Sequence, residues 1–201
     1  DAAVSGNVFS SPSPDRIEAA IEKVEQGKGV LFVIKNYSGD IMNFGMAQDM
    51  AEMEGIQVES VVVKDDVAVP DSTYSTGRRG IAGTMFVHKI AGAMAETGAP
   101  LSEVAGVARE VVANLRSMGM AMSPCILPAV GRPGFTLGEN EIEIGMGIHG
   151  EPGVEKTTMK TAKEIAEILL QKILDDYDYS GSEVAVLVNG LGGTPLMELY
   201  I

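Results

Sequence analysis

Cysteine, histidine and tryptophan are scarce in this chain of 201 residues, which has one cysteine, two histidines and no tryptophan. A single cysteine, Cys125, excludes an intrachain disulfide and is typical of a reducing compartment. We expect Cys125, in "MSPCILP", to be a small core residue and not a nucleophile. With no CxxC pair and no histidines at metal-binding spacing, the sequence argues against a zinc site.

Basic charge and long apolar runs are also lacking. The formal net charge is −13 and aromatic residues make up 5% of the chain. A polyanion would be repelled and would find few stacking platforms, so we expect no nucleic-acid partner. No run approaches the ~18 apolar residues of a membrane span. The sequence therefore predicts a cytoplasmic protein without a membrane partner.

The remaining composition is that of a folded protein, with 45% hydrophobic and 21% charged residues. "PDRIEAAIEKV" has helical apolar spacing, with Ser13, Pro14 and Asp15 at its start. "GVLFVIKNY" and "VESVVVKDDVAV" predict strands buried on both faces. Helices follow in a methionine-rich stretch ending at Gly55, in "TMFVHKIAGAMAE", and after residue 102. This alternation predicts a mostly parallel α/β sheet.

After residue 117 the pattern changes, and we expect the chain to enter a second domain. "ENEIEIGMGI" alternates like a strand, and "TAKEIAEILLQKILDDY" predicts an amphipathic helix. "EVAVLVNG" predicts a further strand before a glycine turn. Both ends of the sequence are abrupt, which indicates a fragment of a longer protein.

The two histidines have different surroundings. His149 follows the alternating strand in "GMGIHGEPG", where glycines allow close approach, and a neutral imidazole can act as a nucleophile or base. The alternative is an ordinary turn histidine bonded to backbone. His88 lies within a predicted helix without a partner histidine, and packing or an interface role is favoured there.

Two further segments carry candidate chemistry. In "KNYSGD", Lys35 could donate to a substrate oxygen and Asp40 could accept a hydroxyl proton, although Asp40 could instead cap the following helix. "TGRRGIAG", with Gly77, Gly80 and Gly83, could hold phosphate at a helix N-terminus, but a flexible loop with a tight helix contact is favoured. Adjacent Asp65 and Asp66 would point to opposite faces of a strand, which disfavours a shared metal.

Several strings together resemble one family along essentially the whole chain. They include "VLFVIKNYSGDIMNF", "STGRRGIAGTMFVHKIAGA", "RSMGMAMSPCILPAVGRPGF", "EIEIGMGIHGEPG" and "VNGLGGTPLMELYI". They are similar to the substrate-binding subunit, or K domain, of dihydroxyacetone kinases. The resemblance implies an α/β, two-domain K-domain fold: a mostly parallel sheet domain at 1–116, and a smaller α+β domain at 117–201 that carries the substrate histidine.

The resemblance also implies site residues. His149 matches the family histidine whose ring nitrogen bonds to the carbonyl carbon of dihydroxyacetone as a hemiaminal. Asp40 matches the aspartate that helps to deprotonate the substrate hydroxyl. Lys35 and Ser11 match residues that contact the substrate.

The resemblance implies partners as well. A separate helical L subunit or domain holds the nucleotide, ATP or ADP, with magnesium, and the K part forms homodimers. This part would bind no cofactor itself. The family's "GGGSGHEP"-type loop and the final segment are not in the sequence, so we expect the fragment alone to be inactive. The alternative is a non-catalytic paralogue that senses dihydroxyacetone and co-activates a transcription regulator.

Overall fold

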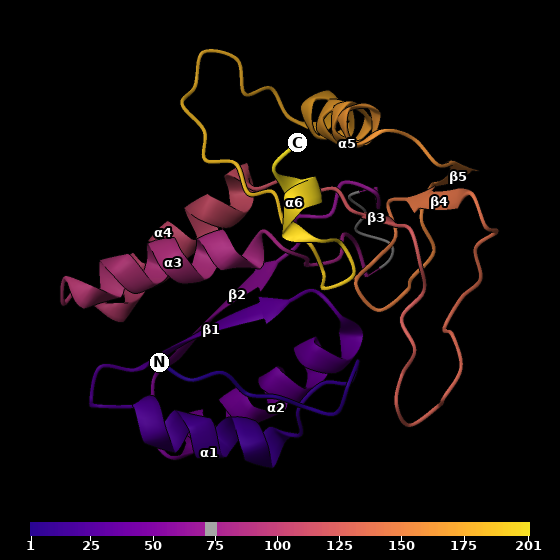
Figure 1. Ribbon diagram of the computed structural model, residues 1–201. Coiled ribbons are helices and arrows are strands. Elements are labelled where there is room, and N and C mark those ends of the chain that lie inside the picture. The colour runs from indigo at the N-terminus through magenta and orange to yellow at the C-terminus, as the bar shows by residue number, and fades with distance from the viewer. Residues whose placement is uncertain (71–75) are drawn as a thin grey trace. The chain divides into compact units, whose positions relative to one another are not determined.

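Figure 1 shows the computed structural model, which describes residues 1–70 and 76–201. The described residues form two compact units. Unit 1 comprises residues 1–65 and 76–115, and unit 2 comprises residues 66–70 and 116–201. The chain therefore passes from one unit to the other between Asp65 and Asp66, and again between Leu115 and Arg116. The domain limits 1–116 and 117–201 stay a prediction.

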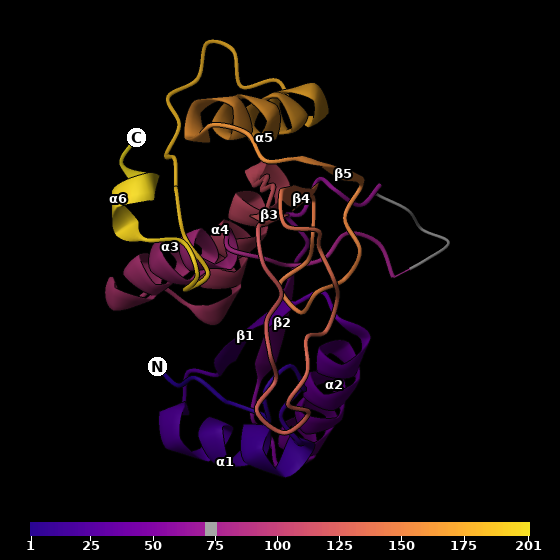
Figure 2. The same cartoon turned by 45° about the vertical axis from the view of Figure 1, so that its right-hand side comes forward.

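Unit 1 is a layered α/β structure, which confirms the predicted fold class. Its elements are α1 (Pro14–Val24), β1 (Val30–Lys35), α2 (Ser38–Met53), β2 (Val58–Val63), α3 (Thr84–Glu96) and α4 (Leu101–Asn114). Strands β1 and β2 pair in parallel, from Val30 opposite Val58 to Lys35 opposite Val63. Figures 1 and 2 show α1 and α2 on one face of these strands and α3 and α4 on the other.

Apolar clusters on the two faces of the strands hold these layers together. The cluster beneath α1 and α2 contains Ile17, Ile21, Phe32, Ile34, Ala47, Ala51 and Val58. The cluster beneath α3 and α4 contains Val61, Val63, Val87, Ala91, Val104, Ala108 and Leu115. Burying each large apolar side chain contributes about 1.5–3 kcal/mol. Both faces of the strands are covered, which agrees with the apolar run that begins β1 and with the three valines that end β2.

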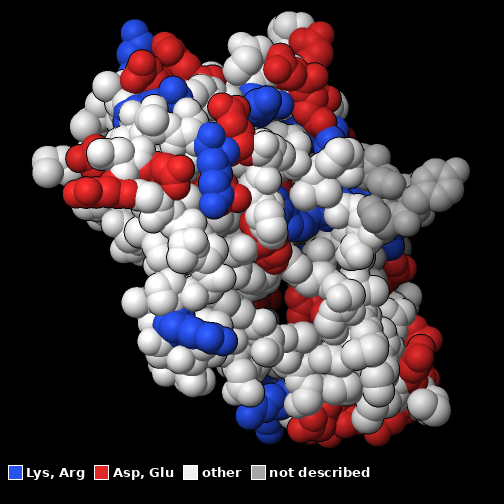
Figure 3. Space-filling view, turned by 90° about the vertical axis from the view of Figure 1, so that its right-hand side faces the viewer, with Lys and Arg blue, Asp and Glu red and all other residues white. Residues whose placement is uncertain are grey.

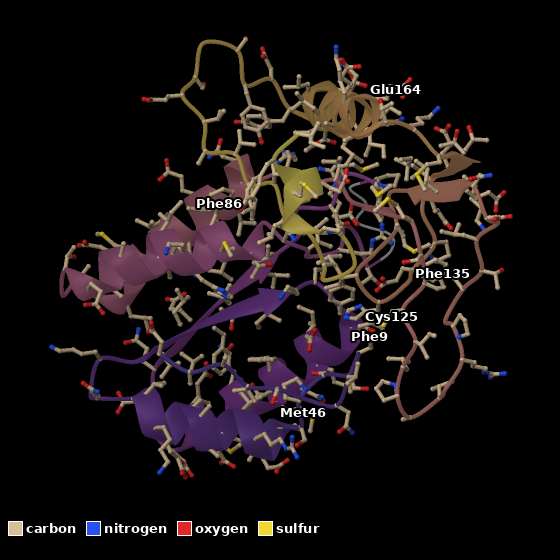
Figure 4. All side chains as sticks on the ribbon, in the orientation of Figure 1. Phe9, Met46, Phe86, Cys125, Phe135 and Glu164 are labelled. Carbon is tan, nitrogen blue, oxygen red and sulfur yellow. The ribbon has the colours of Figure 1, made fainter. Side chains whose placement is uncertain are left out.

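Helix α1 agrees with the prediction from its own sequence, whereas α2 differs from the prediction made for it. Pro14 occupies the first turn of α1, and Ile17 and Ile21 point into the core. Helix α2 begins at Ser38, so that "SGD" forms its first three residues, and Tyr37 precedes it without a side-chain cap. Its methionines are not all core residues, because Met46 is 50% exposed (Figure 4) and the buried positions of the helix are alanines.

Unit 2 is built on a small antiparallel sheet. Its elements are β3 (Met120–Ala121), β4 (Glu141–Ile144), β5 (Glu155–Thr158), α5 (Ala162–Asp176) and α6 (Leu196–Leu199). The strand order is β3-β4-β5. Helix α5 starts with a capping box, in which Thr161 and Glu164 each accept a hydrogen bond from the other's backbone N–H (Figure 4 labels Glu164). This reciprocal pair fixes the first turn of α5.

Three predictions for unit 2 are wrong. "EVAVLVNG" is not a strand in the part of the chain that the structure describes, and its valines Val184, Val186 and Val188 are exposed. Cys125 is exposed and not a core residue. The face of α5 predicted to be buried is only half-buried, since no residue of α5 is fully buried.

The surface carries the acidic excess of the sequence. On the face shown in Figure 3, lysines and arginines lie scattered among aspartates and glutamates. Within the described ranges, no helix is both long and apolar enough to cross a membrane.

Candidate functional site

The carboxyl ends of β1 and β2 lie at one edge of the parallel pair, where binding residues of α/β proteins gather. Lys35 ends β1 opposite Val63, which ends β2. The pairing continues one residue further, because the backbone N–H of Asn36 donates to the carbonyl of Val63 at 3.0 Å. The predicted segments "KNYSGD" and "KDDVAV" therefore both leave the sheet at this edge.

Ser11, Lys35 and Asp40 all lie at or near the start of α2. Asp40 is the third residue of α2 and half-buried. A Cβ added to Gly39 would lie 3.5 Å from Cβ of Ser11, so the segment before α1 passes close to this helix start. Asn43 holds that segment, since its Nδ2 donates to the carbonyl of Pro12 at 2.8 Å. The N-cap alternative for Asp40 is wrong, because the capping position is Tyr37.

The glycine loop before α3 is fixed by side chains from both strand ends. Asn36 Nδ2 donates to the carbonyls of Thr76 at 2.6 Å and Arg78 at 2.7 Å. The buried carboxylate of Asp65 accepts from the backbone N–H of Ile81 at 2.8 Å and of Gly83 at 2.9 Å. These bonds hold the loop to residues that follow β1 and β2, and the tight contact with a helix stays a prediction. The N–H groups that could have bound phosphate bind Asp65.

Close packing of the same loop requires glycine at position 80. A Cβ on Gly80 would lie 2.5 Å from the carbonyl oxygen of Val63 and 3.0 Å from Cα of Lys35. The loop therefore lies directly against the end of β1. This contact positions Lys35 and leaves no room for a side chain at position 80.

Asp65 and Asp66 are both 1% exposed, yet they serve different units. Asp65 binds the start of α3, whereas Oδ1 of Asp66 accepts from the N–H of Ala68 at 3.0 Å. Among the described residues, no group of three or more histidine, cysteine, aspartate or glutamate side chains could hold a metal ion.

His88 lies on α3, exposed at the surface, and is electrostatically coupled to Lys35. Partial desolvation lowers the pKa of the His88 imidazole, and the positive charge of Lys35 lowers it further. Both effects favour the neutral ring. His88 therefore borders the Lys35 region of unit 1.

His149 lies in a closed loop of unit 2 that joins β4 to β5. The loop begins at Gly145, whose φ is +79°, and turns again at Gly150, whose φ is +88°. Val154 N–H donates to the carbonyl of Ile144 at 2.8 Å and closes the loop. Positive φ values favour glycine, so this backbone path explains part of the glycine content around His149.

Glycine is also required at the end of this loop. A Cβ on Gly153 would lie 2.3 Å from the carbonyl oxygen of Ile144. Gly153 N–H donates at 2.7 Å to Oε1 of Glu143, a buried carboxylate on β4. Phe135 packs beside Gly150, where an added Cβ would lie 3.2 Å from the ring (Figure 4). The glycines therefore shape the loop itself, in addition to any space they leave for a ligand.

Glu151 binds His149 through both carboxylate oxygens. Oε1 lies 2.7 Å from Nδ1 of the His149 ring, and Oε2 accepts from the backbone N–H of His149 at 3.0 Å. Partial burial alone would raise the pKa of Glu151, but the hydrogen bonds from the His149 ring and from the backbone outweigh it, and the pKa is lowered. The side chain of His149 is 30% exposed, so the ring is accessible to a small molecule.

The structure places the predicted site residues in two groups. Ser11, Lys35 and Asp40 belong to unit 1, and His149 belongs to unit 2. Sequence reasoning missed Glu151, which lies only two residues from His149, and the anchoring carboxylate of Asp65. The short spacing between His149 and Glu151 in "HGEPG" was the sequence signal that could have identified Glu151.

Comparison with known proteins adds to this geometry. The Dak1 domain matches residues 1–201. The PTS-dependent dihydroxyacetone kinase 1, dihydroxyacetone-binding subunit DhaK, of Listeria innocua is 52% identical over all of this chain and 61% of its own length. The chain thus spans about three fifths of this relative.

Solved structures match as well. The dihydroxyacetone kinase from C. freundii in complex with AMP-PNP and Mg²⁺ superposes with a TM-score of 0.87 at 39% identity, covering 97% of this chain and 36% of that chain. The dihydroxyacetone kinase operon co-activator Dha-DhaQ gives a TM-score of 0.87 at 36% identity, covering 96% of this chain and 60% of that one.

Fold and site together define an α/β protein with a parallel strand pair in one unit and a histidine loop on an antiparallel sheet in the other. The chain belongs to the Dak1 domain family.

Proposed function

We propose that this chain is the dihydroxyacetone-binding part of a dihydroxyacetone kinase, and that it holds the ketone as a hemiaminal on His149. The observation that carries the proposal is the His149–Glu151 pair, because it presents an oriented and accessible imidazole in a glycine-shaped loop. Family membership and the name of the Listeria relative support the choice of ketone.

The proposed covalent bond explains substrate selection. An imidazole nitrogen can add to the carbonyl carbon of a ketone or aldehyde, whereas glycerol has no such carbon. In this proposal Asp40 accepts the proton of the substrate hydroxyl that becomes phosphorylated. Lys35 and Ser11 donate hydrogen bonds to substrate oxygens.

We propose that the nucleotide and magnesium bind elsewhere, on a partner L subunit or domain. The glycine loop before α3 does not fit a nucleotide phosphate, because Asp65 accepts hydrogen bonds from the N–H groups there. Catalysis would then rest on positioning the hydroxyl for in-line transfer from the partner. The proposal includes a cytoplasmic homodimer.

A titration with carbon-13-labelled dihydroxyacetone tests the proposal on the full-length protein. We expect the carbonyl signal to be replaced by a hemiaminal carbon signal, and we expect His149→Ala to abolish the replacement. His88→Ala is the matched control, since it removes the other histidine. Free ketone alone in the wild-type spectrum, or an adduct that persists in His149→Ala, would contradict the proposal.

A second candidate is a dihydroxyacetone-sensing co-activator without kinase activity. The observation that favours it is the equally close match to the operon co-activator structure. The histidine adduct does not separate the two functions. Turnover to dihydroxyacetone phosphate on mixing the full-length protein with an L subunit and a phosphoryl donor would establish the kinase, whereas adduct formation without turnover would favour the co-activator.

A further inference from the structure

The carboxylate of Glu151 makes two different contacts with one residue. Oε1 meets the Nδ1 atom of the His149 ring at 2.7 Å, and Oε2 accepts from the His149 backbone N–H at 3.0 Å. The ring contact lies within the charge-assisted hydrogen-bond range, and the backbone contact has the length of an ordinary N–H···O bond. Since one contact holds the backbone and the other holds the ring, the orientation of the imidazole relative to its own main chain is fixed.

The backbone of Glu151 is itself anchored in the loop. Its carbonyl accepts from the N–H of Gly147 at 3.0 Å, and the carbonyl of Gly147 accepts from the N–H of Gly150 at 3.0 Å. Its side chain is 31% exposed, close to the value for His149. Glu151 is therefore part of the loop framework and not a freely rotating surface group.

The charge state of Glu151 assigns the proton on His149. The lowered pKa of Glu151 keeps this carboxyl ionised at neutral pH. An ionised carboxylate can only accept a hydrogen bond, so Nδ1 of His149 must donate. In a neutral imidazole with its proton on Nδ1, the in-plane lone pair is on Nε2.

We propose that Glu151 is a positioning residue that makes Nε2 of His149 the nucleophilic atom and that stabilises the positive charge which the ring gains on adding to a ketone. This inference rests on the proposed function. The structure carries it through the two contacts of Glu151 with His149, whatever the identity of the ketone.

Addition of a ketone to His149 forms one bond at Nε2 and breaks the π bond of the carbonyl group. The Nε2–carbon bond forms, and the π electron pair of the carbonyl moves to its oxygen, which takes a proton from water. The ring, now alkylated at Nε2 and protonated at Nδ1, is positive and lies against the negative carboxylate. The ring keeps its Nδ1 proton against Glu151, so imidazole, ketone and water give a positively charged hemiaminal and a hydroxide ion, which is released to the solvent.

The experiment compares Glu151→Gln with the wild type in the full-length protein. An amide has one acceptor oxygen in place of two and carries no charge, so it cannot maintain both contacts with the same proton placement. The readouts are the His149 tautomer, from two-bond proton–nitrogen correlations, and the equilibrium constant of the adduct with labelled dihydroxyacetone. Glu155→Gln, an exposed carboxylate on β5, is the matched control.

We expect the wild type and Glu155→Gln to show the Nδ1–H tautomer and equal adduct constants. Loss of a charge-assisted hydrogen bond should lower the adduct constant of Glu151→Gln about tenfold or more, with a mixed tautomer. Glu151→Asp keeps the charge on a side chain one methylene shorter. We expect it to give an intermediate constant, and it replaces Glu151→Gln in the comparison if the latter does not fold.

The outcomes separate the two proposals. If the wild type forms the adduct and Glu151→Gln shows the same tautomer and the same adduct constant, the role of Glu151 is overturned. The proposed function would remain intact in that case. Failure of the wild type to form any adduct would overturn the proposed function, and the role of Glu151 in the addition would be overturned with it.

Discussion

The carboxylate of Asp65, at the end of β2, accepts a hydrogen bond from the backbone N–H of Gly83 at 2.9 Å, just before helix α3 begins. Its other oxygen accepts from Ile81 at 2.8 Å. A buried carboxylate at this place pairs with backbone N–H groups of the buried loop that leads into α3. The acceptor oxygens at this loop are supplied by the chain itself.

Asp65→Asn should therefore destabilise the start of α3. The amide retains one acceptor and turns an NH₂ group toward a backbone donor, at a cost of about 1–3 kcal/mol. Hydrogen exchange at the amides of Ile81 and Gly83 measures the local opening free energy. Asp49→Asn, at an exposed position on α2, is the control. Unchanged protection at both amides would show that Asp65 does not hold the loop.

Gly153→Ala should disturb the His149 loop. The added Cβ would lie 2.3 Å from the carbonyl oxygen of Ile144, where neither backbone atom can move independently. Overpacking of this kind costs about 1–3 kcal/mol, and we expect a lower urea midpoint together with a weaker dihydroxyacetone adduct. Gly134→Ala introduces the same methyl group where nothing lies within 4 Å and should be neutral. Equal effects of the two variants would contradict the steric explanation.

The stability of unit 1 should depend on pH through His88. Its pKa in the folded protein is lowered from the ordinary value of 6.5, so the unfolded chain binds more protons between the two pKa values. Stability contributed by the neutral ring is therefore present above pH 6.5 and is lost as the pH falls below it, toward the folded-state pKa.

The variant His88→Gln checks this dependence, because glutamine does not titrate. We expect the unfolding midpoint of the wild type to fall relative to that of His88→Gln as the pH is lowered from 7 toward 5. The pH-dependent difference between the midpoints with and without His88→Gln should be smaller when Lys35→Met is also present. That substitution removes the positive charge that is the second cause of the lowered pKa of His88. Parallel pH profiles for wild type and His88→Gln would refute the assignment.

Arg116 joins the start of the long segment of unit 2 to the end of α5. Its Nε donates to Oδ2 of Asp176 at 2.5 Å, and its guanidinium lies over the ring of Tyr177 with Cζ 4.7 Å from the centroid. A lysine ammonium cannot reproduce the planar stacking and the directed hydrogen bond together. Arg116→Lys should cost about 1 kcal/mol, seen as faster exchange at the Tyr177 amide. The exposed Arg132→Lys should have no effect there.

The strongest periodic patterns predicted their elements well. The helical spacing of Ile17 and Ile21 and the apolar run of β1 are local signals, and both appear in the structure. The start of α2 was missed because Ser38 follows Tyr37, which offers no capping side chain to mark the boundary. The alternating valines of 183–189 show strand propensity, but a strand also needs a neighbour to pair with.

Site residues were predictable in type but not in their contacts. His149 and Asp40 were singled out from their local sequence. The bond from Glu151 back to His149 depends on the positive φ of Gly150, and the contacts of Asp65 join residues 16 and 18 positions apart. A periodic pattern encodes neither the backbone turn that brings Glu151 to His149 nor the long-range contacts of Asp65.

Residues 66–70 belong to unit 2, although the residues before them belong to unit 1. This limits how the protein can be divided into separately expressed fragments. Val67 N–H donates to the carbonyl of Ser117, and the side chain of Ala68 lies where a Cβ on Gly145 would come within 2.8 Å. A recombinant piece starting at residue 116 would therefore carry the histidine loop without one of the surfaces that supports its first glycine. Studies of ketone capture by an excised half should include the 66–70 peptide, supplied in trans or by circular permutation.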